Sequence, residues 1–214
     1  MHPQPFAINI GRQLGSGGRA IGRLLADSMG ARYLDRELLT LAADRSGLSP
    51  EIFERTDEHK GFLHTLAGSL FPAFSAHTGY YDESVNDDTL FRLQSEAIRR
   101  AAQEAPCIII GRCADYVLRD MPRTVNVFVV ADRRDRIARL CRMNNITEAE
   151  AARRIDKGDQ RRAEYYNFYT QQRWGAAETY DLCLNTSLFG IERTAEIIRQ
   201  FAEEKLAAVE ARMK

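Results

Sequence analysis

The sequence predicts an α/β fold, in which a parallel β-sheet of about five strands is flanked by helices. Five short apolar runs of strand length are spread along the chain, and segments with helical periodicity separate them. Two of these runs, Cys107–Ile110 and Val125–Val130, are apolar almost throughout, which is typical of parallel strands buried on both faces. Strands that alternate with helices favour a parallel sheet covered on both sides.

Length and composition limit the class of protein. The 214 residues suffice for one sizeable domain with a small inserted subdomain. Lysine plus arginine and aspartate plus glutamate balance at 30 each, so net charge gives no reason to expect a nucleic acid or a membrane as partner. The four cysteines form no Cys-x-x-Cys pair and the four histidines are dispersed, which argues against a zinc site. Since neither a signal peptide nor an apolar run of transmembrane length is present, we expect a soluble, cytoplasmic protein.

The first elements follow one another closely. Phe6–Ile10 is rich in apolar residues and predicts a strand, and Arg19–Met29 has the spacing of a helix. A short strand at Ala31–Leu34 leads into a helix from Asp35. Ser49-Pro50-Glu51 is typical of a further helix start, because proline is tolerated in the first turn.

Residues 61–88 have no regular pattern. They combine glycines with aromatic side chains, two histidines and an acidic run around Asp82. A long irregular segment in a compact domain is usually a lid or a substrate-binding loop. A mobile surface loop is the alternative.

Regular elements return in the second half of the chain. Apolar residues at helical spacing predict a helix at Thr89–Glu104, which Pro106 ends. The remaining elements are strands at Cys107–Ile110, Val125–Val130 and Leu182–Leu184, helical segments at Asp132–Met143, Thr147–Lys157 and Gln160–Gln172, and an amphipathic helix at Ile191–Met213.

The most informative segment is Gly11–Ala20, which links the first strand to the first helix. A glycine-rich turn in this place lets backbone amides and a helix N-terminus converge on a phosphate. The segment departs from the usual template Gly-x-x-x-x-Gly-Lys-Ser/Thr. Arg19 stands where lysine is expected, Ala20 where a hydroxyl would meet Mg²⁺, and Gln13 where the first glycine falls. By itself, the segment is either a phosphate-binding loop or a flexible strand–helix turn.

Charged residues follow the other predicted strands as well. These are Asp35 and Arg36 after the second strand, Gly111-Arg112 after the third, and Arg133, Arg134, Arg136 and Arg139 after the fourth. Because the carboxyl ends of parallel strands meet at one edge of a sheet, we expect these side chains to converge. The planar guanidinium group of arginine suits bidentate binding of phosphate. Taken singly, Asp35 could cap a helix, and Arg133 and Arg134 could form a solvated face.

Four segments together resemble the cytidylate kinases. They are Ile8–Gly22, Tyr33-Leu34-Asp35, Ile108–Arg112 and Asp156-x-x-Asp159-x-x-Arg162. The chain resembles most closely a divergent cytidylate kinase-like group, in which Gly-Ser-Gly-Gly-Arg replaces the standard loop, and the resemblance runs from Phe6 to about Phe201. It implies a single P-loop NTPase-type kinase domain over residues 1–214, with an acceptor-binding insert at 49–104 and a helical lid at 132–172.

The resemblance also implies roles for individual residues. The donor phosphates of ATP would be held by Gly15, Ser16, Gly17, Gly18 and Arg19, with Arg136 and Arg139 at the start of the lid helix. The acceptor would be bound by Asp35, Arg36, Arg112, Asp159 and Arg162, and the catalytic residues would be Arg19, Arg112 and Arg162. Mg²⁺ would enter with ATP, held largely through water, with Asp35 as a protein contact. For Asp159 and Arg162, an ordinary exposed helix pair is the alternative.

Three departures from the family pattern bear on the acceptor. Cys113 follows Gly-Arg where cytidylate kinases carry aspartate, a residue associated with recognition of the acceptor. Leu41 stands in place of their acceptor-side arginine, although Arg36 could reach the same space, and Ile155 replaces an arginine before Asp156. The resemblance therefore supports phosphoryl transfer more strongly than it supports a particular base.

The activity that the resemblance implies is transfer of the γ-phosphoryl group of ATP to a nucleoside monophosphate, with CMP or dCMP favoured. Such an acceptor is already anionic, so catalysis needs alignment and charge neutralisation but no dedicated base. One alternative is an ATP-dependent kinase of another small molecule, whose hydroxyl would need a base such as Asp35 or Asp159. The other is a nucleotide-binding protein without catalysis.

Overall fold

The computed structural model describes residues 4–35 and 87–213. The chain divides into two compact units, one formed by Met1–Asp35 with Arg99–Lys214 and the other by Arg36–Ile98. The helices predicted after Asp35 and Ser49 lie outside the described residues, as does nearly all of the irregular segment, and so do Arg36 and Leu41. The boundaries of the acceptor-binding insert and of the lid stay predictions.

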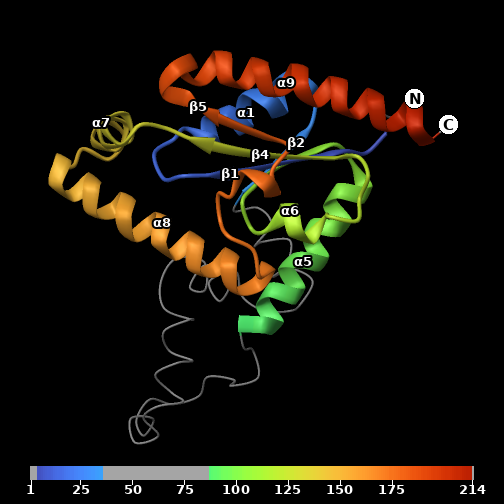
Figure 1. The fold of residues 1–214 in the computed structure, drawn as a ribbon, viewed down its shortest axis with the longest axis horizontal. Helices are drawn as coiled ribbons and strands as arrows, with labels where there is room; N and C mark the ends of the chain where they lie inside the picture. Colours follow the sequence, from blue (N-terminus) through green and yellow to red (C-terminus); the bar gives the residue numbers. More distant parts are fainter. Residues whose placement is uncertain (1–3, 36–86, 214) are drawn as a thin grey trace, which may run out of the picture. The chain divides into compact units, whose positions relative to one another are not determined.

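A five-stranded parallel sheet lies at the centre of the first unit (Figure 1). Its strands are β1 (Ala7–Arg12), β2 (Arg32–Leu34), β3 (Cys107–Ile110), β4 (Thr124–Val130) and β5 (Leu182–Asn185). They lie in the order β2-β3-β1-β4-β5, and every neighbouring pair is parallel. The α/β fold and its five predicted strands are confirmed. Because all strands run in one direction, the segments that follow β1, β3 and β4 leave the same edge of the sheet side by side.

Two of the described helices differ in extent from the predicted ones, and one short helix was not predicted. The described helices are α1 (Gly18–Met29), α5 (Asp87–Glu104), α6 (Ala114–Val117), α7 (Arg133–Asn144), α8 (Glu148–Thr170) and α9 (Thr186–Met213), with a 3₁₀ turn η2 (Ala177–Thr179). The two segments predicted on either side of Gly158 form the single helix α8. Gly158 lies where the Leu14 side chain packs closely against this helix, since a Cβ there would come within 2.8 Å of Leu14. Helix α9 starts five residues before the predicted Ile191 and is interrupted at Gly190.

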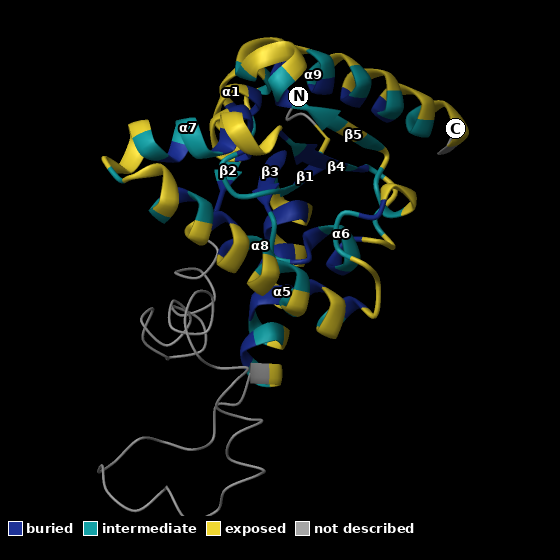
Figure 2. Cartoon of the chain, turned by 60° about the vertical axis from the view of Figure 1, so that its left-hand side comes forward, coloured by how far each residue is buried: buried dark blue, intermediate teal, exposed yellow. Residues whose placement is uncertain are grey.

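The core lies between the sheet and the pair α1 and α9, which pack against each other on one face (Figures 1 and 2). The strands contribute fully buried aliphatic residues, and the largest of them are Ile8, Ile10, Ile108, Ile109, Ile110 and Val125. A second apolar cluster joins α7 to α8 through Leu140, Ala151 and Ile155, and Leu14 packs against it. This second cluster places the helices α7 and α8 directly beside the glycine loop. Within the described ranges, no helix combines the length and the apolar character that a membrane span requires.

Candidate phosphate-binding site

The glycine loop between β1 and α1 needs glycine at two of its positions. Gly15 has φ 82° and Gly17, the N-cap residue of α1, has φ 92°, a left-handed conformation that other residues rarely adopt. A Cβ at Gly15 would also lie 2.9 Å from the carbonyl oxygen of Arg136. Glycine at these positions therefore allows the left-handed backbone conformation and the close approach of the loop to α7.

The loop presents open amides at the N-terminus of α1. The amide and the hydroxyl of Ser16 both donate to the carbonyl of Gln13, at 3.2 and 2.8 Å, and this closes the turn. The first amide of α1 to find a backbone acceptor is that of Ile21, which donates to the Gly17 carbonyl at 3.1 Å. Among the described residues, no acceptor engages the earlier amides of this first turn. A helix N-terminus with free amides is the arrangement that binds a phosphate.

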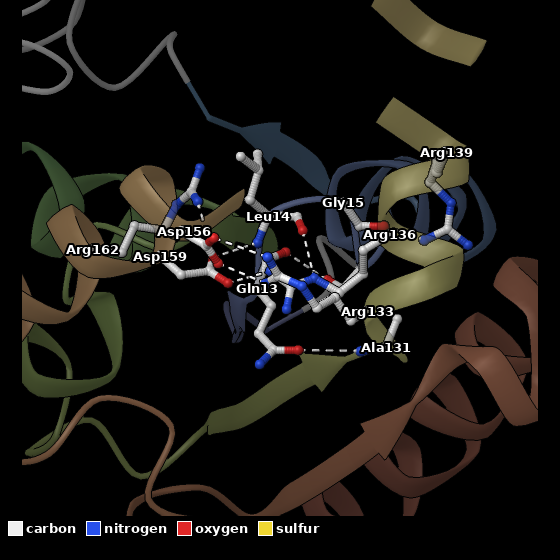
Figure 3. Close-up of polar contacts among 11 residues, drawn as sticks. Gln13, Leu14, Gly15, Ala131, Arg133, Arg136, Arg139, Asp156, Asp159 and Arg162 are labelled. Carbon is white, nitrogen blue, oxygen red and sulfur yellow. Dashed lines mark hydrogen bonds and ion pairs between the residues drawn. The ribbon is translucent and has the colours of Figure 1, made fainter. Parts of the chain in front are cut away.

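Helices α7 and α8 hold the loop by its backbone (Figure 3). The Arg136 Nε atom donates to the Leu14 carbonyl at 2.8 Å, and its Nη2 atom pairs with the carboxylate of Asp159. Asp159 in turn accepts from the Leu14 amide at 2.7 Å, and Arg139 donates to the Gly15 carbonyl. The structure therefore places all three predicted charged residues on the loop. Their contact with phosphate or acceptor stays a prediction.

The neighbouring charged residues separate into buried and solvated pairs. Arg133 forms a two-point pair with Asp156, at 2.6 and 2.9 Å, and both side chains are exposed. Arg134 is exposed too, so the interpretation of these arginines as a solvated face is confirmed. Arg162 lies 3.5 Å from Asp159 at the next turn of α8, but this is no ordinary exposed pair, because Asp159 also binds the loop.

Two of the predicted acceptor residues, Asp35 and Arg112, lie at the ends of β2 and β3. Asp35 follows β2 and is buried, and its carboxylate accepts an ion pair from Arg19 Nε at 2.7 Å, with the Arg19 side chain 53% exposed. Arg112 follows β3 in a turn in which three consecutive residues, Gly111, Arg112 and Cys113, have positive φ angles. Non-glycine residues in this conformation are uncommon and cluster at functional sites.

Arg12, the last residue of β1, belongs to the same group although sequence reasoning passed over it. Its half-buried side chain lies among the guanidinium groups of Arg162, Arg112 and Arg19 and the carboxylate of Asp35. Burial first, and then the charge of these arginines, lowers its pKa to about 9, although Asp35 opposes the shift. The signal in the sequence was a charged residue at the carboxyl end of a central strand, immediately before the glycine loop.

A second polar contact anchors the far end of α8. The Tyr166 hydroxyl donates to the carboxylate of Asp115 at 2.6 Å, which ties α8 to the short helix α6 behind the Gly-Arg turn. Burial raises the pKa of Asp115 above its ordinary 3.8, and the hydrogen bond from Tyr166 offsets part of this shift.

Replacement of Tyr166 with phenylalanine is expected to lower the free energy of unfolding by about 1–3 kcal/mol, because the half-buried carboxylate of Asp115 loses the hydrogen bond from the Tyr166 hydroxyl. The folded pKa of Asp115 lies above its unfolded value, so its protonated form stabilises the fold at low pH and this contribution is lost as the pH rises through the folded pKa. Tyr166→Phe raises that pKa further. The destabilisation relative to wild type is therefore smallest in acid and grows as the pH rises. Urea unfolding at several pH values measures this destabilisation, with Tyr116→Phe as the control. A loss of unfolding free energy that does not vary with pH would contradict the hydrogen bond between Tyr166 and the Asp115 carboxylate.

Comparison with known proteins places this geometry in context. A model described as the cytidylate kinase-like family matches residues 7–188. Among solved structures, an uncharacterized protein from Eubacterium ventriosum is similar over 92% of this chain and 98% of that one, with a TM-score of 0.68 at 24% identity. Shikimate kinase from Bacteroides thetaiotaomicron is similar over the same shares of the two chains, with a TM-score of 0.51 at 15% identity. At these identities the likenesses show the fold. A search of curated proteins finds no match.

Proposed function

Because the chain belongs to the cytidylate kinase-like family, we propose that it transfers the γ-phosphoryl group of ATP to a nucleoside monophosphate, with CMP and dCMP as the first candidates. Family membership and the P-loop kinase fold support a phosphotransferase. The observation that carries the proposal is the open N-terminus of α1, whose first-turn amides lie under a glycine loop with Arg19 beside it. All four cysteines are free, which suits the reducing cytoplasm where we place the protein.

In the proposed reaction, the protein aligns two anions and neutralises their charge. The loop amides and Arg19 bind the β- and γ-phosphates of ATP, while Arg112 and Arg162 bind the phosphate of the acceptor. An oxygen of that phosphate attacks the γ-phosphorus, the bond to the β–γ bridging oxygen breaks, and ADP leaves with the electron pair. The acceptor oxygen is already ionised, so no proton has to be removed. The products are ADP and a nucleoside diphosphate.

The described residues fit a Mg²⁺ ion that arrives with ATP better than one held by the protein alone. Among them, no group of three or more His, Cys, Asp or Glu side chains is placed to bind a metal. Ala20 supplies no hydroxyl, and the Ser16 hydroxyl is engaged within the loop. The carboxylate of Asp35 would contact the ion through water, as is usual for Mg²⁺ bound to phosphates. When bound, the ion neutralises charge on the donor phosphates.

One observation favours a second candidate, a kinase that phosphorylates a hydroxyl group. Cys113 is buried, and burial raises the pKa of its thiol. The thiol therefore offers no charged group that could recognise the nucleobase of a monophosphate acceptor. The nearest following carboxylate, that of Asp115, accepts from Tyr166. A hydroxyl acceptor would need a general base, and Asp35 is the buried carboxylate beside Arg19.

A panel of acceptors distinguishes these functions. With ATP and Mg²⁺, we expect ADP release to depend on CMP or dCMP, and to be at least tenfold slower with UMP, AMP and GMP. A coupled assay for ADP measures this, with cytidine and simple polyols as further acceptors. Turnover with a hydroxyl compound and none with any monophosphate would replace the proposal with the second candidate. Tight ATP binding without acceptor-dependent ADP release would indicate a nucleotide-binding protein.

A further inference from the structure

The side chain of Arg12 occupies a space that two glycines create. A Cβ at Gly111, in the turn after β3, would lie 1.9 Å from Arg12 Nη1. A Cβ at Gly18, the first residue of α1, would lie 2.8 Å from Arg12 Cβ. Any larger residue at either position would displace the arginine. The stem of the Arg12 side chain therefore lies against Gly18 on the proposed donor side, and its guanidinium group lies against the Gly111-Arg112 turn on the proposed acceptor side.

The surroundings of this guanidinium group are unusually positive. Among the described residues, the positive charges of Arg162, Arg112 and Arg19 act on it, and Asp35 is the one carboxylate that does so. Asp35 already pairs with Arg19 at 2.7 Å. Within residues 4–35 and 87–213, Arg12 forms no ion pair or side-chain hydrogen bond, although its neighbours Arg19 and Arg162 each have a carboxylate.

A half-buried cation among like charges destabilises a fold unless something balances it. A structural arginine would be expected to donate to a carbonyl or a carboxylate, as Arg136 does. Among the described residues, Arg12 has no anionic partner for its guanidinium group. A phosphoryl group that passes from the loop to the Gly-Arg turn would supply the oxygens and the negative charge.

We propose that Arg12 is a further catalytic residue, whose guanidinium group binds the γ-phosphoryl group as it passes from the glycine loop to the acceptor. This rests on the proposed phosphoryl transfer. The bond from the γ-phosphorus to the β–γ bridging oxygen breaks, the electron pair leaves with ADP, and the bond from the acceptor oxygen to phosphorus forms. Arg12 stays protonated throughout and donates to the equatorial oxygens of the moving group.

Binding of ATP and ADP to wild type, Arg12→Met and Arg12→Lys tests the assignment without any acceptor. Since only ATP carries the γ-phosphoryl group, calorimetry in the presence of Mg²⁺ should show ATP affinity about tenfold lower in Arg12→Met, which corresponds to the loss of one charged hydrogen bond. ADP affinity should stay within about twofold. Arg12→Lys should lie between the two, and Arg193→Met, which removes an exposed arginine of α9, should match wild type.

Thermal unfolding without nucleotide adds a second test. If Arg12 were structural, its removal would lower the unfolding temperature, whereas the proposed role predicts an equal or higher temperature. Because removal of Arg12 relieves repulsion, Arg12→Met should unfold at a temperature equal to that of wild type or about 2–4 °C higher. A marked fall in this temperature, or equal weakening of ATP and ADP, would overturn the proposal, as would unchanged affinity for both. If Arg12→Met does not fold, Arg12 is structural.

Turnover separates this inference from the proposed function. With the best monophosphate acceptor, Arg12→Met should lose about 10²–10³-fold in kcat. If wild type phosphorylates no monophosphate, the proposed function fails, whereas the ratio of ATP to ADP affinity still decides the role of Arg12.

Discussion

Arg19→Ala is expected to abolish phosphoryl transfer and to leave the fold intact. Arg19 stands at the position of the lysine in the usual phosphate loop, as the second residue of α1, and its half-exposed side chain pairs with Asp35. Loss of one such positively charged group at the transferred phosphate costs about 10²–10³ in kcat, and more where the group acts mainly on the transition state. A coupled ADP assay measures the loss, and far-UV circular dichroism checks the fold.

Two further variants sharpen this prediction. Arg19→Lys restores the charge in the form that the usual loop carries, so it should recover a large part of kcat if the role is electrostatic. Arg23→Ala removes an exposed arginine one turn further along α1 and should leave turnover within about twofold. Near-normal turnover in Arg19→Ala would contradict the assignment of this loop as the binding site for the donor phosphates.

The second large effect is expected from Asp159→Asn, which should lower both the stability and the ATP affinity of the protein. Asp159 is 18% and its partner Arg136 is 7% exposed, so the substitution leaves a buried guanidinium without its counter-charge. Breaking a buried pair in this way costs about 3 kcal/mol. The amide side chain can still accept from the Leu14 backbone, so the loop should persist in a less fixed position. We expect ATP to bind at least tenfold more weakly.

Asp156→Asn is the matched control, because it lies three residues earlier on α8 and also removes the counter-charge of an arginine of α7. The pair of Asp156 with Arg133 is exposed at both ends, 61% and 53%, so the unfolding temperature should hardly change. Thermal unfolding and ATP calorimetry on both variants measure the contrast. Equal effects of the two substitutions would refute the view that Asp159 positions the loop. The double variant Arg136→Met with Asp159→Asn should be less destabilised than the two single changes added together.

The order of strands and helices could be predicted because each element carries its own periodicity. The uniformly apolar runs in β3 and β4 and the glycines before α1 are local patterns, and they place strands and loop within a few residues of their observed bounds. The two helical segments predicted at Thr147–Lys157 and Gln160–Gln172 form the single helix α8, which runs through Gly158 without a break. In the structure, the missing Cβ allows Leu14 to pack against the helix.

Part of the candidate site could also be predicted from the sequence. The glycine loop, Arg19, Asp35 and Arg112 could be placed at one edge of the sheet, because all strands of a parallel sheet end there. The contacts of Arg136 and Asp159 with the loop could not, since they join residues 122 and 145 positions apart, and pattern in a sequence carries no information on such pairs.

By itself, then, the sequence determined a parallel α/β sheet, a glycine-rich loop before α1 and a supply of arginine after each central strand, because these depend on local periodicity and residue type. Tertiary structure alone decided what each arginine does. Arg133 lies in solvent against Asp156, and Arg136 holds the loop through Leu14 and Asp159. Arg12 stands among like charges, with space made for it by Gly18 and Gly111. The physical reason is that the effect of a guanidinium group depends on its burial and its neighbours, and both arise only when distant segments pack together.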